Sequence, residues 1–232
     1  MDKRIYLVGC DTPNTTAGGG VIVIPIGRDI SNQIIRANHY SGTIVNNSYA
    51  FYGLYSGSDL MGVSQWGYAM NPASAKNIVK GTANDEYMEL NRLWVDDAMP
   101  RNTESQFISG CIKLIKHHFP KVGWIQSFAD ERCVCKGVVY QACNFGYYGA
   151  HKSMFVEFEG VMYHKINLTK DAHNKKHNGG NRKIGNEYAF DVLNANKDRL
   201  IFHEFEQYRY LYFINQRLKA NLLLTEKPYP KA

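Results

Sequence analysis

Apolar residues recur along the chain in two patterns, and each pattern predicts one type of secondary structure. Short runs that are apolar throughout, or that alternate with polar residues, are typical of strands. Such runs are bounded by turn-forming or charged residues and occupy residues 21–26, 48–57, 60–70, 86–97 and 124–130. Residues 9–20 contain few apolar side chains and many glycines, so we expect residues 1–20 to be irregular.

A short helix is predicted between the first two of these strands. Residues 29–37 carry three isoleucines at helical spacing, and Asp29 or Ser31 can begin the helix. His39 and Tyr40 should therefore lie directly after its last turn.

The clearest helix in the sequence covers residues 102–119. Its apolar residues recur on one face, and Asn102 or Thr103 can cap its first turn. Gln106 follows Thr103 at the spacing of a capping box, and Pro120 marks the end. This segment should connect the strand before it to the strand at residues 124–130.

The last third of the chain predicts one more short helix and two hairpins. A helix of about two turns is expected within residues 136–145. Residues 153–166 form two alternating runs around Glu159-Gly160, and residues 200–205 and 209–214 repeat the pattern. The order of elements favours a single α/β (α+β) domain over residues 1–232, with a mixed, mostly antiparallel central sheet flanked by helices.

Composition narrows the class of protein. The chain has 232 residues, of which 44% are hydrophobic, and lacks both a membrane-spanning run and the apolar core of a secretory signal. We therefore expect a cytoplasmic protein without a membrane partner. The five cysteines show no framework of paired spacings, which favours reduced thiols. Cys133, Cys135 and Cys143 lie close together in the sequence, but only one residue separates the first two and no fourth zinc ligand is well placed. The sequence therefore disfavours a zinc site.

The net charge of +6 is unevenly distributed. A segment rich in basic residues and glycine predicts a basic loop inserted at residues 167–199, which could contact the phosphates of a nucleic acid. A solvated surface loop is the alternative interpretation, and it stays open at this point. The candidate DNA-binding residues are Lys170, Lys175, Lys176, Arg182 and Lys183.

The predicted order of strand, capped helix, strand, short helix and hairpin resembles the acyl-CoA-binding half of the GNAT acetyltransferases. In that superfamily, the N-terminal amides of the capped helix face the cofactor pyrophosphate. Arg101, Asn102 and Ser105 occupy the corresponding segment here. Glu104 and Gln106 stand where glycines usually allow the backbone to approach the phosphates.

A more specific resemblance depends on several motifs that occur in order: "NHYSG", "MELNRLWVDD", "PRNTESQFIS", "SFAD", "GVVYQACNFGYYG" and the final "YPK". Over roughly residues 30–232 they resemble the Mom proteins of phage Mu and related phages. The resemblance implies a GNAT-like enzyme that adds a carbamoylmethyl (methylcarbamoyl) group to the N6 amine of adenine in DNA. Such a modification protects phage DNA from host restriction in the cytoplasm of the host bacterium.

The resemblance also implies roles for individual residues. His39, Tyr40, Asp130 and Tyr140 match residues of a catalytic centre that contains iron, for which imidazole, carboxylate and phenolate are suitable ligands. Without the resemblance, Asp130 could simply cap the following helix, and Tyr140 could be a buried core residue. The cofactor-binding candidates are Arg92, Arg101, Asn102 and Ser105.

The implied partners are a small-molecule group donor and double-stranded DNA with a flipped adenine. The donor is acetyl-CoA or another small molecule, and a homodimer is left open. Two other classes of function also stay open. One is an ordinary GNAT N-acetyltransferase that acts on a small amine or a protein. The other is a DNA-binding protein without catalytic activity.

Overall fold

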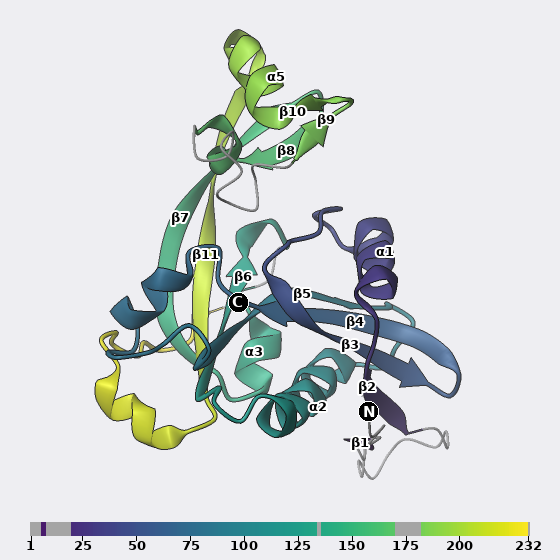
Figure 1. Cartoon of the computed structure of the whole chain (residues 1–232), viewed down its shortest axis with the longest axis vertical. Coiled ribbons are helices and arrows are strands. Elements are labelled where there is room, and N and C mark those ends of the chain that lie inside the picture. The colour runs from purple at the N-terminus through teal and green to yellow at the C-terminus, as the bar shows by residue number, and fades with distance from the viewer. Residues whose placement is uncertain (1–5, 8–19, 134–135, 170–181, 232) are drawn as a thin grey trace.

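A mixed sheet of nine strands organises the part of the chain that the structure describes. A computed structural model describes residues 6–7, 20–133, 136–169 and 182–231 (Figure 1). The strand order is β1-β2-β3-β4-β5-β6-β11-β7-β8, and every neighbouring pair is antiparallel except β5 and β6. The predicted class, an α/β protein with a mostly antiparallel sheet and flanking helices, is therefore confirmed.

The strands of the main sheet are β1 (Tyr6–Leu7), β2 (Val21–Pro25), β3 (Ser48–Ser56), β4 (Asp59–Gly67), β5 (Tyr87–Val95), β6 (Trp124–Asp130), β7 (Gly146–Phe158), β8 (Val161–His164) and β11 (Ile201–Phe213). A second sheet contains β9 (Lys183–Ile184) and β10 (Glu187–Tyr188). The α-helices are α1 (Arg28–Asn38), α2 (Thr103–His118), α3 (Val138–Ala142) and α5 (Ala189–Ala195).

The parallel pair β5 and β6 joins two antiparallel parts of the sheet. Helix α2 is the connection between these strands, as parallel strands require. The strands pair at only three positions, the last of which is Glu89 with Gln126. After that position β6 continues beside β11, while β5 continues beside β4. The sheet therefore divides where these two strands separate.

One face of the sheet is covered by α2 and α3 (Figure 1). Residues of α2 such as Phe107, Ile108 and Leu114 are fully buried against Met88 of β5 and Ile125 of β6. Side chains alternate along a strand, so Glu89 and Gln126 must project from the opposite face.

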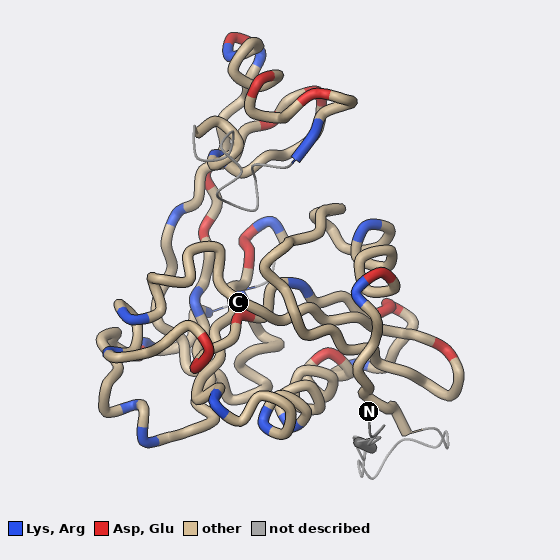
Figure 2. Tube along the Cα trace, in the orientation of Figure 1, with Lys and Arg blue, Asp and Glu red and all other residues tan. Residues whose placement is uncertain are grey.

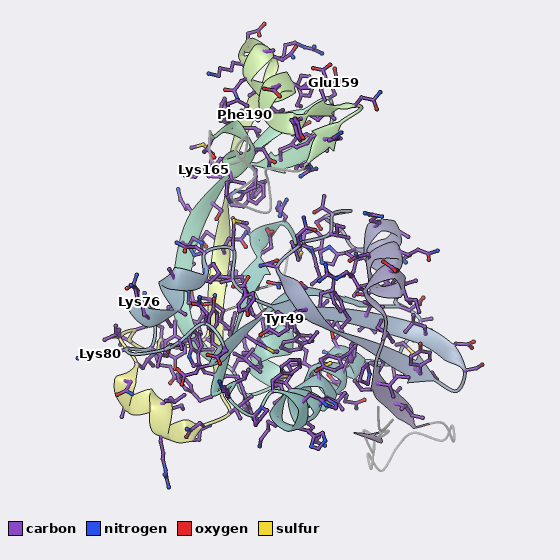
Figure 3. The ribbon with its side chains drawn as sticks, viewed as in Figure 1. Tyr49, Lys76, Lys80, Glu159, Lys165 and Phe190 are labelled. Carbon is purple, nitrogen blue, oxygen red and sulfur yellow. The ribbon has the colours of Figure 1, made fainter. Side chains whose placement is uncertain are left out.

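Helix α1 lies on that opposite face. Gln65 of β4 donates hydrogen bonds from its amide nitrogen to the hydroxyl of Ser31 (2.9 Å) and the carbonyl oxygen of the Asn32 side chain (3.0 Å). These two bonds hold α1 beside β4, with His39 immediately after the helix, as predicted. On the other side of the sheet, the ring of Tyr49 contacts Tyr68 and Phe119 (Figure 3).

Residues 159–169 and 182–200 form an upper lobe at the ends of β7 and β11 (Figure 1). The lobe has a small core that it shares with the end of β7. Its buried members are Val156, Phe158, Tyr163, Ala189 and Leu193. The predicted basic loop at 167–199 is therefore wrong for residues 182–199, which form β9, β10 and α5 because apolar side chains hold them together. Residues 170–181 lie outside the described residues.

Three further predictions need correction. The hairpin expected at 200–214 is one strand, β11, because Gln207 continues the ladder with Asp130 on one side and His151 on the other. The segment predicted to be irregular contains β1, which pairs with β2. The helix expected within 136–145 has only five residues.

The predicted capping box at the start of α2 is not formed. Asn102 occupies the N-cap position with φ of 73° and makes no capping bond with its side chain. The hydroxyl of Thr103 instead donates to the carbonyl oxygen of Pro100 (2.6 Å). Asparagine tolerates this left-handed conformation better than most residues, which explains how the chain turns sharply into the helix.

No helix among the described residues is long and apolar enough to cross a membrane.

Replacement of Gly67 tests the packing that positions β4 beside the site. A Cβ atom there would meet the carbonyl oxygen of Asn47 and lie 2.6 Å from the Cα of Ser48, and backbone atoms cannot move aside cheaply. We expect Gly67→Ala to lower the free energy of unfolding by about 1–3 kcal/mol in urea denaturation. Gly20→Ala is the control, since no atom of the described residues lies within 4 Å of its Cβ position. Equal stabilities of the two variants would contradict this packing.

Candidate active site

A cleft of about 980 Å³ opens on the face of the sheet opposite α2 and α3. Its floor comes from β5, β6, β7 and β11, and its walls from the segment after α1 and from the upper lobe. The side chains that carry its chemistry are His39, Tyr40, Glu89, Arg92, Gln126, Asp130, Arg132, His151, Arg182 and Arg209. The structure therefore brings together residues from both ends of the sequence.

His39 lies at the C-terminal end of α1, with only 9% of its surface exposed. The backbone N–H of Ser41 donates to its Nδ1 (3.1 Å), which favours the neutral tautomer with the proton on Nε2. Burial, together with the positive charges of Arg92 and Arg132, lowers the pKa of His39 to about 3. His39 is therefore a neutral imidazole near pH 7.

Tyr40 connects the segment after α1 to the end of β6. Its hydroxyl donates to Oδ2 of Asp130 (3.3 Å), and its ring lies 4.3 Å from that of His39. Burial of the hydroxyl end and then the charge of Asp130 raise the pKa of Tyr40, although 57% of the residue remains exposed. Tyr40 is therefore a neutral hydrogen-bond donor.

Asp130 forms an ion pair with Arg132 two residues later. The guanidinium Nε lies 3.0 Å from each carboxylate oxygen, and the backbone N–H of Arg132 also donates to Oδ1. Burial alone would raise the pKa of Asp130, but the bonds and charge of Arg132 outweigh it and lower the pKa. The guanidinium also lies 4.0 Å from the ring centre of Phe155, which fixes its plane.

Arg92 holds the segment after α1 against β5. Its Nε donates to the carbonyl oxygen of Thr43 (3.0 Å), and a second guanidinium nitrogen donates to the carbonyl oxygen of Asn91 (2.7 Å). The structure thus places this candidate in the cleft, beside His39 and Tyr40.

Glu89 and Gln126 form a polar pair in the floor of the cleft that sequence reasoning missed. The amide nitrogen of Gln126 donates to Oε2 of Glu89 (2.6 Å). Burial raises the pKa of Glu89 to about 7, against the opposing effects of this bond and of Arg92 and Arg209. The available signal was an acidic residue, Glu89, between the apolar residues Met88 and Leu90 of a predicted strand.

The remaining predicted residues lie elsewhere. Tyr140 is 8% exposed in the core beneath the opposite face, where its ring lies near those of Phe145 and Tyr210. Ser105 lies on that side as well, since its carbonyl oxygen accepts a bond from the Cys143 thiol (3.3 Å). Arg101 and Asn102 are exposed at the start of α2.

Two of the five predicted DNA-binding residues are described. Arg182 lines the cleft from the upper lobe, with its guanidinium 4.0 Å from the ring centre of Tyr163, and Lys183 is exposed on β9. Lys170, Lys175 and Lys176 lie outside the described residues.

The implied iron site does not fit the side chains as they are arranged. His39, Tyr40 and Asp130 gather in the cleft, but Tyr140 lies beneath the opposite face. Both oxygens of Asp130 already bind Arg132, whose positive charge opposes a cation. Within the described ranges, no cluster of three or more His, Cys, Asp or Glu side chains could hold a metal ion.

Comparisons with known proteins assign the chain to a family. The model of the Mom protein family matches residues 21–231, so the chain belongs to this family. It is also 48% identical, over 205 residues, to the protein named methylcarbamoylase mom from Escherichia phage Mu. That alignment covers 87% of this chain and 80% of the phage Mu protein.

Solved acetyltransferase structures resemble the fold only in part. A probable acetyltransferase from Staphylococcus epidermidis has a TM-score of 0.45 at 10% identity, with 84% of this chain and 99% of that chain covered. The IAA acetyltransferase from Bacillus cereus has a TM-score of 0.46 at 12% identity and the same coverage. The family assignment depends on the sequence matches alone.

Glu89 gives the fold a predictable pH dependence. Its pKa in the folded protein is raised from 4.5 to about 7, so its contribution to stability is complete below pH 4.5 and is lost as pH rises through 7. We therefore expect Glu89→Gln to stabilise the protein at pH 8 by on the order of 1–3 kcal/mol, with less gain at pH 5. Part of Glu89 remains open to the cleft, which favours the lower end of that range. Thermal unfolding of both proteins at pH 5 and pH 8 measures the difference in stability. An equal shift in unfolding temperature at the two pH values would contradict the burial of a charged carboxylate.

Proposed function

We propose that the chain is an enzyme that transfers a methylcarbamoyl group to the N6 amine of adenine in DNA. The observation that carries the proposal is its membership of the Mom family, with 48% identity to a protein named methylcarbamoylase over 87% of the chain. The "NHYSG" and "SFAD" motifs of the family resemblance meet in one cleft, where Tyr40 contacts Asp130. The substrate and the site of modification follow from the family resemblance.

The charge of the cleft supports a polyanionic substrate. In the part of the chain that the structure describes, five arginines and two acidic residues line it, and one arginine neutralises Asp130. Lys and Arg residues also occur on the upper lobe and on the body of the protein (Figure 2). Phosphates bind such surfaces irrespective of base sequence.

The size of the cleft supports base flipping. The N6 amine is hidden within a base pair, so an enzyme must rotate the nucleotide out of the duplex to reach it. A volume of about 980 Å³ is at the upper end of ligand pockets, which leaves room for a base and a small donor. The donor is a small molecule, either acetyl-CoA or another carrier of the group, and the reaction takes place in the cytoplasm of the bacterial host.

The cleft residues have separable roles in this proposal. Arg92 anchors the segment that carries His39 and Tyr40, and Arg132 fixes the orientation of Asp130. Neutral His39 can donate a hydrogen bond from Nε2 to the bound base or donor, while the Tyr40 hydroxyl, which donates to Asp130, can accept one. Because the predicted iron ligands do not fit a metal as they are arranged, no step of this proposal passes through iron.

Expression in a restriction-deficient bacterium tests the proposed function. Nucleoside mass spectrometry of the host DNA should detect N6-carbamoylmethyl deoxyadenosine. Asp130→Ala and His39→Ala should fold and bind DNA but reduce this product at least about 100-fold, since each contributes to the reaction site. An N6-acetyl product would favour an ordinary acetyltransferase, and unmodified DNA from folded protein would contradict the proposal.

Basic residues of the upper lobe should contribute to DNA affinity. We expect Lys183→Gln and the double variant Arg182→Gln/Lys183→Gln to weaken binding similarly for all duplex sequences. Each lost phosphate contact should reduce the slope of log affinity against log salt by about 1.

Lys80→Ala is the matched control for these variants. Lys80 is exposed on the body of the protein, away from the upper lobe in which Glu159 and Lys165 lie (Figure 3). Fluorescence anisotropy over a range of salt concentrations measures all the slopes. A slope in the double variant equal to that of Lys80→Ala would rule out a role of the upper lobe in phosphate binding.

A further inference from the structure

The pair of Glu89 and Gln126 occupies the point where the sheet divides. It is the last pair of the parallel ladder, and both side chains line the cleft. On the β4 side, Glu89 pairs with Gly67, beside which the backbone of Asn47 and Ser48 lies. Glu89 is only partly buried and lines the cleft, so a ligand there can approach its carboxylate from the cleft.

Gln126 has an unused hydrogen-bond acceptor at this position. Its amide nitrogen is occupied by Glu89, and only 3% of the residue is exposed. Its buried oxygen Oε1 accepts no hydrogen bond from the described residues. An unsatisfied buried carbonyl destabilises a protein by about 1–3 kcal/mol, which favours a ligand that donates to it.

Arg209 supplies a donor next to these acceptors. On β11 it pairs with Phe128, so it lies one diagonal step from Gln126 on the same face of the sheet. Its Nε is buried and has no acceptor among the described residues, and its guanidinium lies 5.3 Å from the ring centre of Phe128. The floor therefore presents two acceptors beside one donor and an aromatic ring.

This arrangement complements the edge of an adenine. The N6 amine offers two N–H donors, and the neighbouring ring nitrogen is an acceptor. One N–H can bind Oε1 of Gln126, the other can bind the carboxylate of Glu89, and the ring nitrogen can accept from Arg209. Thymine and guanine present a carbonyl oxygen in place of the amine, which would face the two acceptors unfavourably.

We propose that Glu89 and Gln126 bind the N6 amine of the flipped adenine and that Glu89 accepts its proton during methylcarbamoyl transfer. This inference rests on the proposed function. The new bond joins N6 to the methylene carbon of the group. The donor of this step is therefore a carboxamide compound with a leaving group on that carbon, because the methyl carbon of acetyl-CoA bears only hydrogens. The bond between the carbon and the leaving group breaks, and its electron pair departs with the leaving group. One N6 proton passes to the Glu89 carboxylate, which solvent later deprotonates.

The surroundings of Glu89 suit this role. The charged groups that act on it are Arg92 from its own strand and Arg209 from β11, while Gln126 from β6 and Gly67 from β4 are neutral. The hydroxyl of Tyr87, earlier on β5, is affected by Glu89 but remains protonated. Because burial raises the pKa of Glu89 to about 7, the carboxylate can accept and release a proton near neutral pH.

The test compares variants by the amount of modified deoxyadenosine in the DNA of the expressing bacterium. We expect Glu89→Gln to reduce the product at least about 100-fold, as loss of a general base does. Glu89→Asp keeps a carboxylate and should retain more product than Glu89→Gln. Gln126→Leu, which removes the free acceptor, should reduce the product about 10-fold or more. Glu86→Gln is the matched control, because it makes the same chemical change outside the cleft and should leave the product unchanged.

Two further measurements separate chemistry from folding and binding. Glu89→Gln should unfold at a temperature no lower than that of the wild type at pH 8 and should bind a generic DNA duplex with unchanged affinity. Product from Glu89→Gln at half the wild-type amount or more would overturn the inference while the proposed function stands. If the wild-type protein forms no product, the proposed function fails and the inference fails with it.

Discussion

The short parallel contact between β5 and β6 is the feature on which the rest of the architecture depends. The strands pair at only three positions before each continues beside a different antiparallel neighbour. Parallel strands need a crossover, and α2 supplies it while covering one face with a continuous apolar core. The opposite face is left free for polar side chains at the division of the sheet. The cleft is thus a consequence of the topology. The side chains of its floor are held in place by the strands that carry them.

The distribution of charge within this cleft is equally constrained. Among the described residues, the acidic side chains that line it are Glu89 and Asp130, and each lies near at least one arginine. Arg132 is committed to Asp130 and Arg92 to Thr43, so these two guanidinium groups orient the site. Arg209 keeps an unused donor toward the floor. Arg92 and Arg132 therefore hold the site together, whereas Arg209 can bind a substrate.

The opposite faces of the sheet explain why the residues implied by the family resemblance divide into two groups. Tyr140 and Ser105 belong to elements that pack beneath the sheet, whereas His39, Tyr40, Arg92 and Asp130 surround the cleft above it. Order along the chain could not reveal this separation. The side of a sheet on which a side chain lies depends on register, and the bulge in β5 between Leu90 and Arg92 changes the alternation.

Local sequence determined most of the elements and the family of this protein. Hydrophobic periodicity predicted the strands and α2 closely, because burial of one face imposes a period on the residues themselves. It failed at β11, because pairing with β6 and β7 continues the strand through the polar residues Glu206 and Gln207. It also failed at residues 182–199, because a small apolar core orders this polar segment. The motifs located His39, Tyr40 and Asp130, but only the tertiary structure brought Glu89 beside Gln126 and Arg209. Those residues are far apart along the chain, and their chemistry arises from burial and from neighbouring charges that no local pattern records.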